Sequence, residues 1–310
     1  MSENVLVTGG SGFIGSWVLR ELFKRGARPV VYDLQRGDER WERILDTDAA
    51  RVVFVEGDLT DIDQLSVACR EHAITHVIHL GALLTPACQS DPWLGCQVNV
   101  LGSVAVFEQA RLNPQRIKSI SFASSLAVYG PEPDDVVRSS DIDTTHTPSF
   151  YGAYKRSVEL IARQYWQHFG IGSFGLRPHV VYGPERHLGL TAGPSLAARA
   201  AALGEAFTID YSGPAGYDYV EDVARAFVRG AFETPEGSNV VDLPSVEATT
   251  DEMVATINEL VPESHGQLTT RGEGIPSNTP ANWHLISELF PDWSATSLQD
   301  GLRKTIEFYR

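Results

Sequence analysis

The sequence predicts an α/β protein built on a doubly wound parallel sheet. Short apolar and β-branched runs alternate, along the first half of the chain, with longer segments whose apolar residues recur at helical spacing. A glycine-rich turn joins the first of these runs to the first helical segment. Because parallel strands need crossover connections between them, this alternation favours one sheet with helices on both faces.

The glycine turn lies between the first predicted strand, residues 5–7, and the first predicted helix, residues 16–25. Its glycines permit a tight turn, close approach to a pyrophosphate and close packing of the helix on the strand. Free backbone N–H groups at the helix start would then bind the phosphates of a dinucleotide. The residues that we expect to hold this dinucleotide are Gly9, Gly12, Phe13, Ile14 and Gly15.

The second predicted strand, residues 28–33, ends in an acid. Asp33 stands roughly 20 residues beyond the turn, the separation at which a carboxylate binds the adenine ribose. A carboxylate there would repel the 2′-phosphate of NADP, so Asp33 favours NAD, although the nearby Arg36 weakens that preference. A turn-forming role is the alternative for Asp33.

Later strand ends supply further candidate cofactor contacts. The third strand leads into an acidic turn, and the fourth ends in small and apolar residues beside which a ribose could pass. Asn99 is polar within the mostly apolar helical stretch 91–113, so it either bonds nearby backbone or positions something functional. These expected contacts are Asp58, Leu59, Leu80, Ala82 and Asn99, and a turn cap is the alternative for Asp58.

The second half of the chain differs from the first in composition, because residues 184–216 are rich in Gly, Pro and Ala. We expect a Rossmann-type NAD-binding domain over residues 1–177, with a returning segment at about 218–244. A smaller, partly discontinuous substrate lobe would occupy residues 178–310, with ligand between it and the carboxyl edge of the sheet. Helices are predicted over residues 150–169, 196–203, 220–232, 249–260 and 297–309.

The composition of the chain limits the classes of partner that the protein can bind. The net charge of −15 argues against a nucleic-acid partner, and no apolar stretch approaches the roughly 20 residues of a membrane span. Cys69, Cys88 and Cys96 lack metal-binding spacing and favour buried thiols in a reducing cytoplasm. His76 and His79 are expected to pack within their strand, so we predict no metal site.

Three residues from two separate stretches of the chain suggest a catalytic site. Tyr151 and Lys155 lie at i and i+4 of a predicted helix and share one face, and Ser125 follows the fifth predicted strand. A nearby ammonium favours phenolate, so we expect a lowered pKa for Tyr151 and a role as general base. Lys155 would also hold the nicotinamide ribose, and Ser125 would bond the substrate oxygen. The alternative is a solvated helix face with an aromatic anchor.

Taken together, these motifs resemble the extended short-chain dehydrogenase/reductase family, which includes sugar-nucleotide epimerases and dehydratases. The resemblance covers nearly the whole chain. It implies a Rossmann domain, a Ser-Tyr-Lys site, NAD(P), and a homodimer built from the helices that begin near Asp91 and Phe150. The matching stretches are 8–15, 57–59, 79–82, 99–102, 124–130, 151–155, 176–184, 218–225 and 297–307.

The chain also departs from the patterns of that family. Leu126 and Ala127 stand where its 4,6-dehydratases have an Asp-Glu pair, so dehydration would lack a proton carrier. Val180 and Ala215 stand where its nucleotide-sugar enzymes usually have an asparagine and an arginine that contact the substrate. A diphosphate is therefore poorly matched, and we expect a substrate without a nucleotide.

We therefore expect an NAD-dependent oxidoreductase that acts on a hydroxyl of a small non-nucleotide carbohydrate, such as a sugar, sugar acid or polyol. An NAD-dependent epimerase of a sugar or nucleotide-sugar, with a retained cofactor, is the alternative, and a non-catalytic dinucleotide sensor is a third. Arg186 and His187 could meet a carboxylate or hydroxyls, although loop charges are often only solvated. The residues expected to contact the substrate are Ser125, Arg186, His187, Thr191 and Tyr217.

Overall fold

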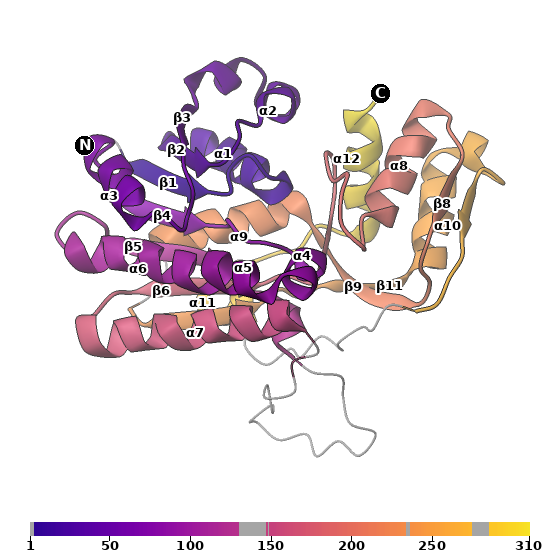
Figure 1. Ribbon diagram of the computed structural model, residues 1–310. Coiled ribbons are helices and arrows are strands. Elements are labelled where there is room, and N and C mark those ends of the chain that lie inside the picture. Colours follow the sequence, from indigo (N-terminus) through magenta and orange to yellow (C-terminus); the bar gives the residue numbers. More distant parts are fainter. Residues whose placement is uncertain (1–2, 130–146, 148, 234–235, 275–284) are drawn as a thin grey trace.

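The structure is a computed structural model that describes residues 3–129, 147, 149–233, 236–274 and 285–310 (Figure 1). Its centre is a parallel sheet of seven strands in the order β10-β6-β5-β4-β1-β2-β3. This confirms the predicted α/β class with a doubly wound parallel sheet. The strands are β1 Asn4–Thr8, β2 Arg28–Asp33, β3 Val53–Glu56, β4 His76–His79, β5 Ser119–Ala123, β6 Ser173–Arg177 and β10 Ser238–Asp242.

Helices cover both faces of this sheet. Helices α1 (Phe13–Arg25) and α9 (Val220–Glu233) pack together on one face, and α3 (Ile62–Glu71), α6 (Gly102–Leu112) and α7 (Phe150–Phe169) pack on the other (Figure 1). Since successive strand residues point to opposite faces, each strand contributes to two cores. Val5 and Val7 of β1 thus belong to one hydrophobic cluster, and Leu6 belongs to the other.

The strand order places the expected site. From β1 the chain proceeds outward through β2 and β3, and then it returns to β4 on the other side of β1. Ligands of open α/β sheets bind at the carboxyl ends of the strands where the order reverses in this way. The glycine turn follows β1 and therefore lies at that switch point.

The helical stretch 91–113 is divided into three parts. Helix α5 (Pro92–Cys96) leads into a π-helical turn over Gln97–Leu101, and α6 continues from Gly102. The π turn contains Asn99, and such turns are frequent at functional sites. A further short helix, α4 (Thr85–Ser90), precedes this stretch and was not predicted from the sequence.

The second half adds two small sheets. One has the order β11-β9-β7 and the other pairs β12 with β8, and the sequence analysis predicted none of these strands. Figure 1 shows α8, α10 and α12 beside β8, away from the central sheet. The elements are β7 Val180–Tyr182, α8 Gly193–Leu203, β8 Phe207–Ile209, β9 Pro214–Tyr219, β11 Val246–Thr249, α10 Thr250–Leu260, β12 Leu268–Thr270, α11 Ile286–Leu289 and α12 Leu298–Phe308.

The two strand histidines lie on opposite faces of the sheet. The ring of His76 packs on Phe232, whereas His79 bonds Thr8 Oγ1 and Ser103 Oγ on the other face. Within the described residues no group of three or more potential metal ligands is present, and no helix has the length and apolar content to cross a bilayer. Gly130 of the matching stretch 124–130 lies outside the described residues.

Candidate active site

The glycine turn has the geometry that a dinucleotide requires. Gly9 has a φ of 70°, and its carbonyl accepts the N–H of Gly12 over 3.1 Å. A Cβ on Gly15 would lie 2.3 Å from the Gly9 oxygen, so only glycine fits there. Within the described residues no side chain caps the start of α1, which leaves the N–H groups near Phe13 and Ile14 available for phosphate oxygens. The turn therefore fits NAD.

Asp33 ends β2 beside this turn. One carboxylate oxygen accepts the N–H of Ser11 over 3.1 Å, and the other accepts the N–H of Leu34 over 2.8 Å. These bonds hold the carboxylate at the edge of the glycine turn, where an adenine ribose would lie. Both oxygens keep lone pairs for ribose hydroxyls, since each carboxylate oxygen accepts more than one hydrogen bond.

Helix α2 (Asp38–Leu45) supports the turn from outside, and the sequence analysis did not find this contact. Arg40 donates to the Ser11 carbonyl over 2.8 Å, and the Trp41 indole donates to the Gly10 carbonyl over 3.2 Å. Both donors bind carbonyls of the turn, so neither competes for its N–H groups. The signal in the sequence was weak, because a charged stretch with one tryptophan is typical of many surface helices.

The remaining expected cofactor residues divide into two kinds. Leu59 is buried, and Leu80 donates its N–H to the Thr8 carbonyl over 3.0 Å, so both line the strand ends. Asn99 instead bonds both backbone groups of Leu83, at 2.8 and 2.9 Å. Of the two roles left open for Asn99, the structure thus shows the local backbone one. It anchors the segment that carries Ala82.

Asp58 shows the turn-cap geometry that was the alternative for it. Its Oδ1 accepts both the N–H and the hydroxyl of Thr60 at 2.8 Å. The side chain remains exposed, so its second oxygen is open to solvent or to an adenine edge.

Ser125, Tyr151 and Lys155 come together at the carboxyl end of β5. Ser125 caps a short 3-10 turn by accepting the Ala127 N–H over 3.1 Å, and its hydroxyl lies close enough to the Tyr151 phenol to affect the ionisation of that phenol. The Lys155 ammonium donates to the Ala123 carbonyl over 2.7 Å and lies 5.6 Å from the centre of the Tyr151 ring. Two distant segments, the turn after β5 and helix α7, thus present a hydroxyl, a phenol and an ammonium to one place.

The expected lowering of the Tyr151 pKa was wrong for this structure. Burial raises the pKa of Tyr151 to about 12, although the hydrogen bond from Ser125 opposes the rise. Lys155 lies over the ring, where it does little to stabilise a phenolate oxygen. Burial also lowers the pKa of Lys155 to about 8. Desolvation therefore outweighs the attraction between these two groups.

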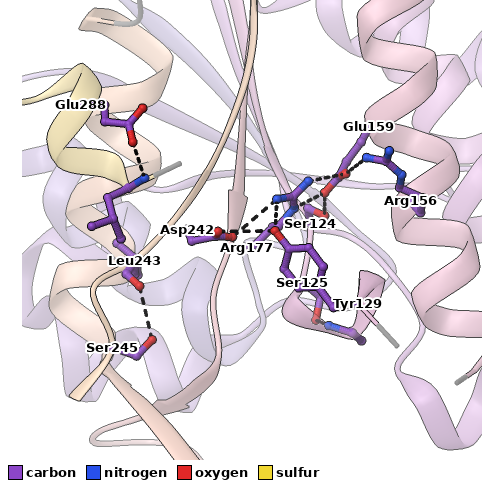
Figure 2. Close-up of polar contacts among 12 residues, drawn as sticks. Ser124, Ser125, Tyr129, Arg156, Glu159, Arg177, Asp242, Leu243, Ser245 and Glu288 are labelled. Carbon is purple, nitrogen blue, oxygen red and sulfur yellow. Dashed lines mark hydrogen bonds and ion pairs between the residues drawn. The ribbon is translucent and has the colours of Figure 1, made fainter. Parts of the chain in front are cut away.

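A buried polar network lies directly behind Ser125 (Figure 2). Arg177, at the end of β6, makes a two-pronged contact with Glu159 of α7, at 2.6 and 2.8 Å, and also donates to the Tyr129 hydroxyl. Ser124 donates to the same carboxylate over 2.5 Å. Asp242 of β10 completes the network, 3.6 Å from the guanidinium.

This network holds the turn that carries Ser125 from both sides. Ser124 precedes the catalytic candidate, Tyr129 follows it, and both are bound to one Arg177–Glu159 pair. The sequence analysis did not find the network, although Glu159 follows Lys155 at helical spacing. Its members are separated by up to 118 positions, from Ser124 to Asp242, so only the folded chain brings them together.

The expected substrate residues do not form one group. Arg186 points toward Thr191, whose Oγ1 accepts from it over 2.6 Å, and toward Tyr217. His187 points the other way, 3.7 Å from Glu185, a buried residue that pairs with Arg43 of α2 at 2.8 Å. Burial lowers the pKa of His187 despite the carboxylate. The structure therefore joins Arg186, Thr191 and Tyr217 and separates His187 from them.

The structure also shows the positions at which the sequence departs from the family pattern. Val180 and Ala215 are both buried, in β7 and β9, and neither has a polar group to offer. Leu126 and Val128 are buried in the turn after Ser125, together with Tyr129. The site is thus built around Ser125, Tyr151 and Lys155, without an acid at positions 126 and 127.

Comparisons with known proteins agree with this fold. The model of the NAD dependent epimerase/dehydratase family matches residues 5–240. UDP-glucose 4-epimerase of Mycolicibacterium smegmatis is 30% identical, with 98% of each chain covered. UDP-glucuronate 4-epimerase 2 of Arabidopsis thaliana is 28% identical over 99% of this chain and 75% of its own length. Thermus thermophilus UDP-glucose 4-epimerase, solved with NAD, has a TM-score of 0.78 at 26% identity, covering 99% and 98% of the chains.

The fold and the site define an NAD-dependent enzyme of the short-chain dehydrogenase/reductase type. More specifically, the chain belongs to the NAD dependent epimerase/dehydratase family, whose model matches most of its length. This confirms the resemblance seen in the sequence, the enzyme class and NAD as the cofactor.

Proposed function

We propose that the protein is an NAD-dependent epimerase that inverts one hydroxyl-bearing carbon of a carbohydrate while it retains its cofactor. The observation that carries this proposal is the meeting of Ser125, Tyr151 and Lys155 at the carboxyl edge of the sheet. The relatives named above are sugar-nucleotide 4-epimerases, which favours inversion over the net oxidation that the sequence analysis placed first.

The proposed roles follow from the chemistry of each group. Tyr151 takes the proton of the substrate hydroxyl and later returns it, and Ser125 donates a hydrogen bond to the same oxygen. Lys155 lies over the phenol ring and does little for its ionisation, and the cationic nicotinamide of bound NAD would supply the positive charge that favours the phenolate. NAD, when bound at the glycine turn, would supply the hydride acceptor for the substrate carbon and then the hydride donor for the opposite face of that carbon. Proton and hydride are both returned, so the substrate gains and loses nothing overall.

The cofactor-binding roles are part of the same proposal. The turn from Gly9 to Gly15 would bind the pyrophosphate, Asp33 would bind the adenine ribose, and Lys155 would bind the nicotinamide ribose. Asp58, Leu59, Leu80 and Ala82 line the neighbouring strand ends. The division into residues 1–177, with 218–244 returning, and a substrate lobe over 178–310 also remains a proposal, as does the cytoplasmic location.

Isotope retention tests the proposed reaction. The purified protein is incubated with UDP-glucose, UDP-glucuronate, and free sugars and sugar acids, and the products are identified by NMR. We expect interconversion of a substrate with its epimer, retention of deuterium placed at the inverted carbon, and no net NADH absorbance. NADH in proportion to an oxidised product would show a dehydrogenase instead, and a chain that binds NAD but converts none of these compounds would contradict the proposal.

A further inference from the structure

We propose that Glu185 is a positioning residue that ties the segment after β7 to helix α2, and that its ion pair with Arg43 slows the release of NAD. This role rests on the proposed function, in which NAD stays bound between turnovers. It names the contact that keeps the cofactor in place. Glu185 would act through the segments that it joins, without touching the substrate.

Glu185 is held in a conformation and an environment that both disfavour it. Its φ is 70°, in the left-handed region that a residue with a side chain rarely adopts. Its carboxylate side chain is only 1% exposed, so a charged group has left water there. Backbone strain of this kind persists where the surrounding contacts hold it, and it often marks a functional position.

Two partners from distant parts of the chain hold Glu185. Arg43 of α2 donates to one carboxylate oxygen over 2.8 Å, and the Glu185 N–H donates to the Tyr309 hydroxyl over 2.6 Å. The hydrogen bond to Glu185 raises the pKa of Arg43, as a bond to the charged form does. Tyr309 follows α12, and Arg199 of α8 lies 5.8 Å from the centre of its ring. Glu185 therefore joins α2 to the helices of the proposed substrate lobe.

The same segments border the glycine turn. Trp17 of α1 donates to the Pro184 carbonyl over 3.1 Å, which places the segment after β7 against the helix that starts at the turn. Trp41 of α2 donates to the Gly10 carbonyl over 3.2 Å within the turn itself. In Figure 1, α2 lies on the side of the NAD-binding half that is turned toward α12 and α8. The ion pair thus closes a ring of contacts that runs through the turn, α2, the segment after β7 and α1.

Opening this ring is costly, because it leaves a buried carboxylate without its charged partner. We therefore expect NAD at the glycine turn to leave more slowly while the ion pair is closed. The arginines close to this carboxylate or to the neighbouring His187 ring are Arg40, Arg43 and Arg199.

These charges allow a positioning role to be told apart from a direct effect of charge on the cofactor. Loss of the Glu185 charge alone would make this place more positive and hold the phosphates of NAD more tightly. Loss of the Arg43 charge alone would hold them less tightly. A positioning role instead predicts that either loss releases NAD faster, because either one breaks the same contact.

Release of radiolabelled NAD from the loaded protein into excess unlabelled NAD tests this role without turnover. We expect Glu185→Gln and Arg43→Gln each to speed release by about tenfold, as the loss of a charge-assisted hydrogen bond implies. The double variant should be no faster than either single variant, since residues in contact do not act additively. Arg43→Lys keeps the charge and a donor, so it should restore most of the slow release.

A matched control separates positioning from a general loss of stability. Arg229→Gln breaks another ion pair between distant segments, with Asp292 at 3.0 Å, and should leave NAD release unchanged. The Arg43 side chain is 46% exposed, so its variants should fold even if Glu185→Gln does not. Equal release from wild type and Arg43→Gln would overturn the role, as would slower release from Glu185→Gln, effects that multiply in the double variant, or equal acceleration by Arg229→Gln. Failure of the proposed epimerisation would appear only in the turnover assay.

Discussion

Tyr151 is the residue on which the proposed proton transfer depends most. Its phenol meets Ser125 and lies beneath the Lys155 ammonium. Replacement by phenylalanine keeps the ring and removes the only atom that carries the proton. We expect Tyr151→Phe to lower kcat by about 10²- to 10⁴-fold, the usual loss for a general acid–base group. NAD affinity should stay within about twofold, because the ring still packs in place.

Tyr154 provides the matched control for this experiment. Tyr154 lies three residues after Tyr151 on α7, but its hydroxyl donates to the Pro92 carbonyl over 2.7 Å and therefore faces α5. Tyr154→Phe should therefore keep nearly full kcat while it loses one hydrogen bond. A fully active Tyr151→Phe variant would show that another group moves the proton.

Asp218 is a single buried residue that is expected to make the stability of the protein depend on pH. It accepts the His179 N–H over 2.7 Å, and burial raises its pKa from 3.8 to about 6. The folded chain therefore binds this proton more tightly than the unfolded chain does. Stability falls as pH rises through about 4 to 6, by up to about 3 kcal/mol, and the loss is complete above that window.

Asp218→Asn should remove this dependence, because the amide oxygen still accepts from His179 and does not titrate. We expect the unfolding free energy of the variant, relative to wild type, to increase between about pH 4 and pH 6 and to stay constant above. Urea unfolding of both proteins across that range measures it. The comparison must be relative, since the lowered pKa values of His79 and His179, about 3 and about 4, act in the opposite direction. Parallel curves for the two proteins would contradict the assignment.

At the scale of elements, the glycine turn is the place where an added side chain would be least tolerated. A Cβ at Gly15 would meet the backbone of Gly9 and Gly10 at 2.3 and 2.6 Å, and backbone cannot move aside as a flexible side chain can. We expect Gly15→Ala to displace α1 from the turn and to weaken NAD by at least about tenfold, which corresponds to 1.4 kcal/mol.

Gly172 offers a control of the same chemistry. A Cβ there would lie 3.7 Å from the nearest atom, the Gly237 oxygen, which is an ordinary contact. Gly172→Ala should leave NAD affinity unchanged, as measured by titration of the cofactor-free protein. Unchanged affinity in Gly15→Ala would mean that the turn does not bind the cofactor in the proposed way.

The elements also show where sequence patterns succeed. Helix α7 begins and ends at the predicted residues, Phe150 and Phe169, because its cap at Ser149 and its Gly170 stop are local signals. Strand β9 was missed because it begins with proline and contains Gly216, both poor strand formers. Partners on β7 and β11 stabilise it despite that composition.

At the scale of the whole molecule, exposed apolar side chains indicate how two copies of the chain associate. Large apolar side chains are exposed along α5, the π turn and α7, and three of them are Trp93 at 74%, Leu101 at 57% and Leu160 at 49%. Exposed apolar surface of this kind marks association sites. We propose that these helices form the homodimer that the sequence analysis expected.

Light scattering after size exclusion tests the dimer. Wild type should show twice the 34.0 kDa mass of one chain, and the double variant Leu101→Glu with Leu160→Glu should show the single mass. Leu203→Glu, at the end of α8, is the control, since that side chain is 45% exposed but lies on a different helix. A monomeric wild type at micromolar concentration would refute this arrangement.

The sequence by itself determined the features that depend on short spacings. The glycine turn, the acid that ends β2, the alternation of strands and helices, and the Tyr151–Lys155 pair all follow from the periods of a strand or a helix. Those features predicted the fold class and the cofactor, whereas the family followed from the resemblance of motifs along nearly the whole chain to a known family.

Only the tertiary structure decided how distant groups share space. It placed the Lys155 ammonium on the Ala123 carbonyl, so that burial controls the Tyr151 pKa. It also turned Arg186 away from His187 and toward two phenols from other elements. The physical reason is that desolvation and pairing depend on which side chains surround a group in the folded chain, and spacing along the sequence carries no record of those neighbours.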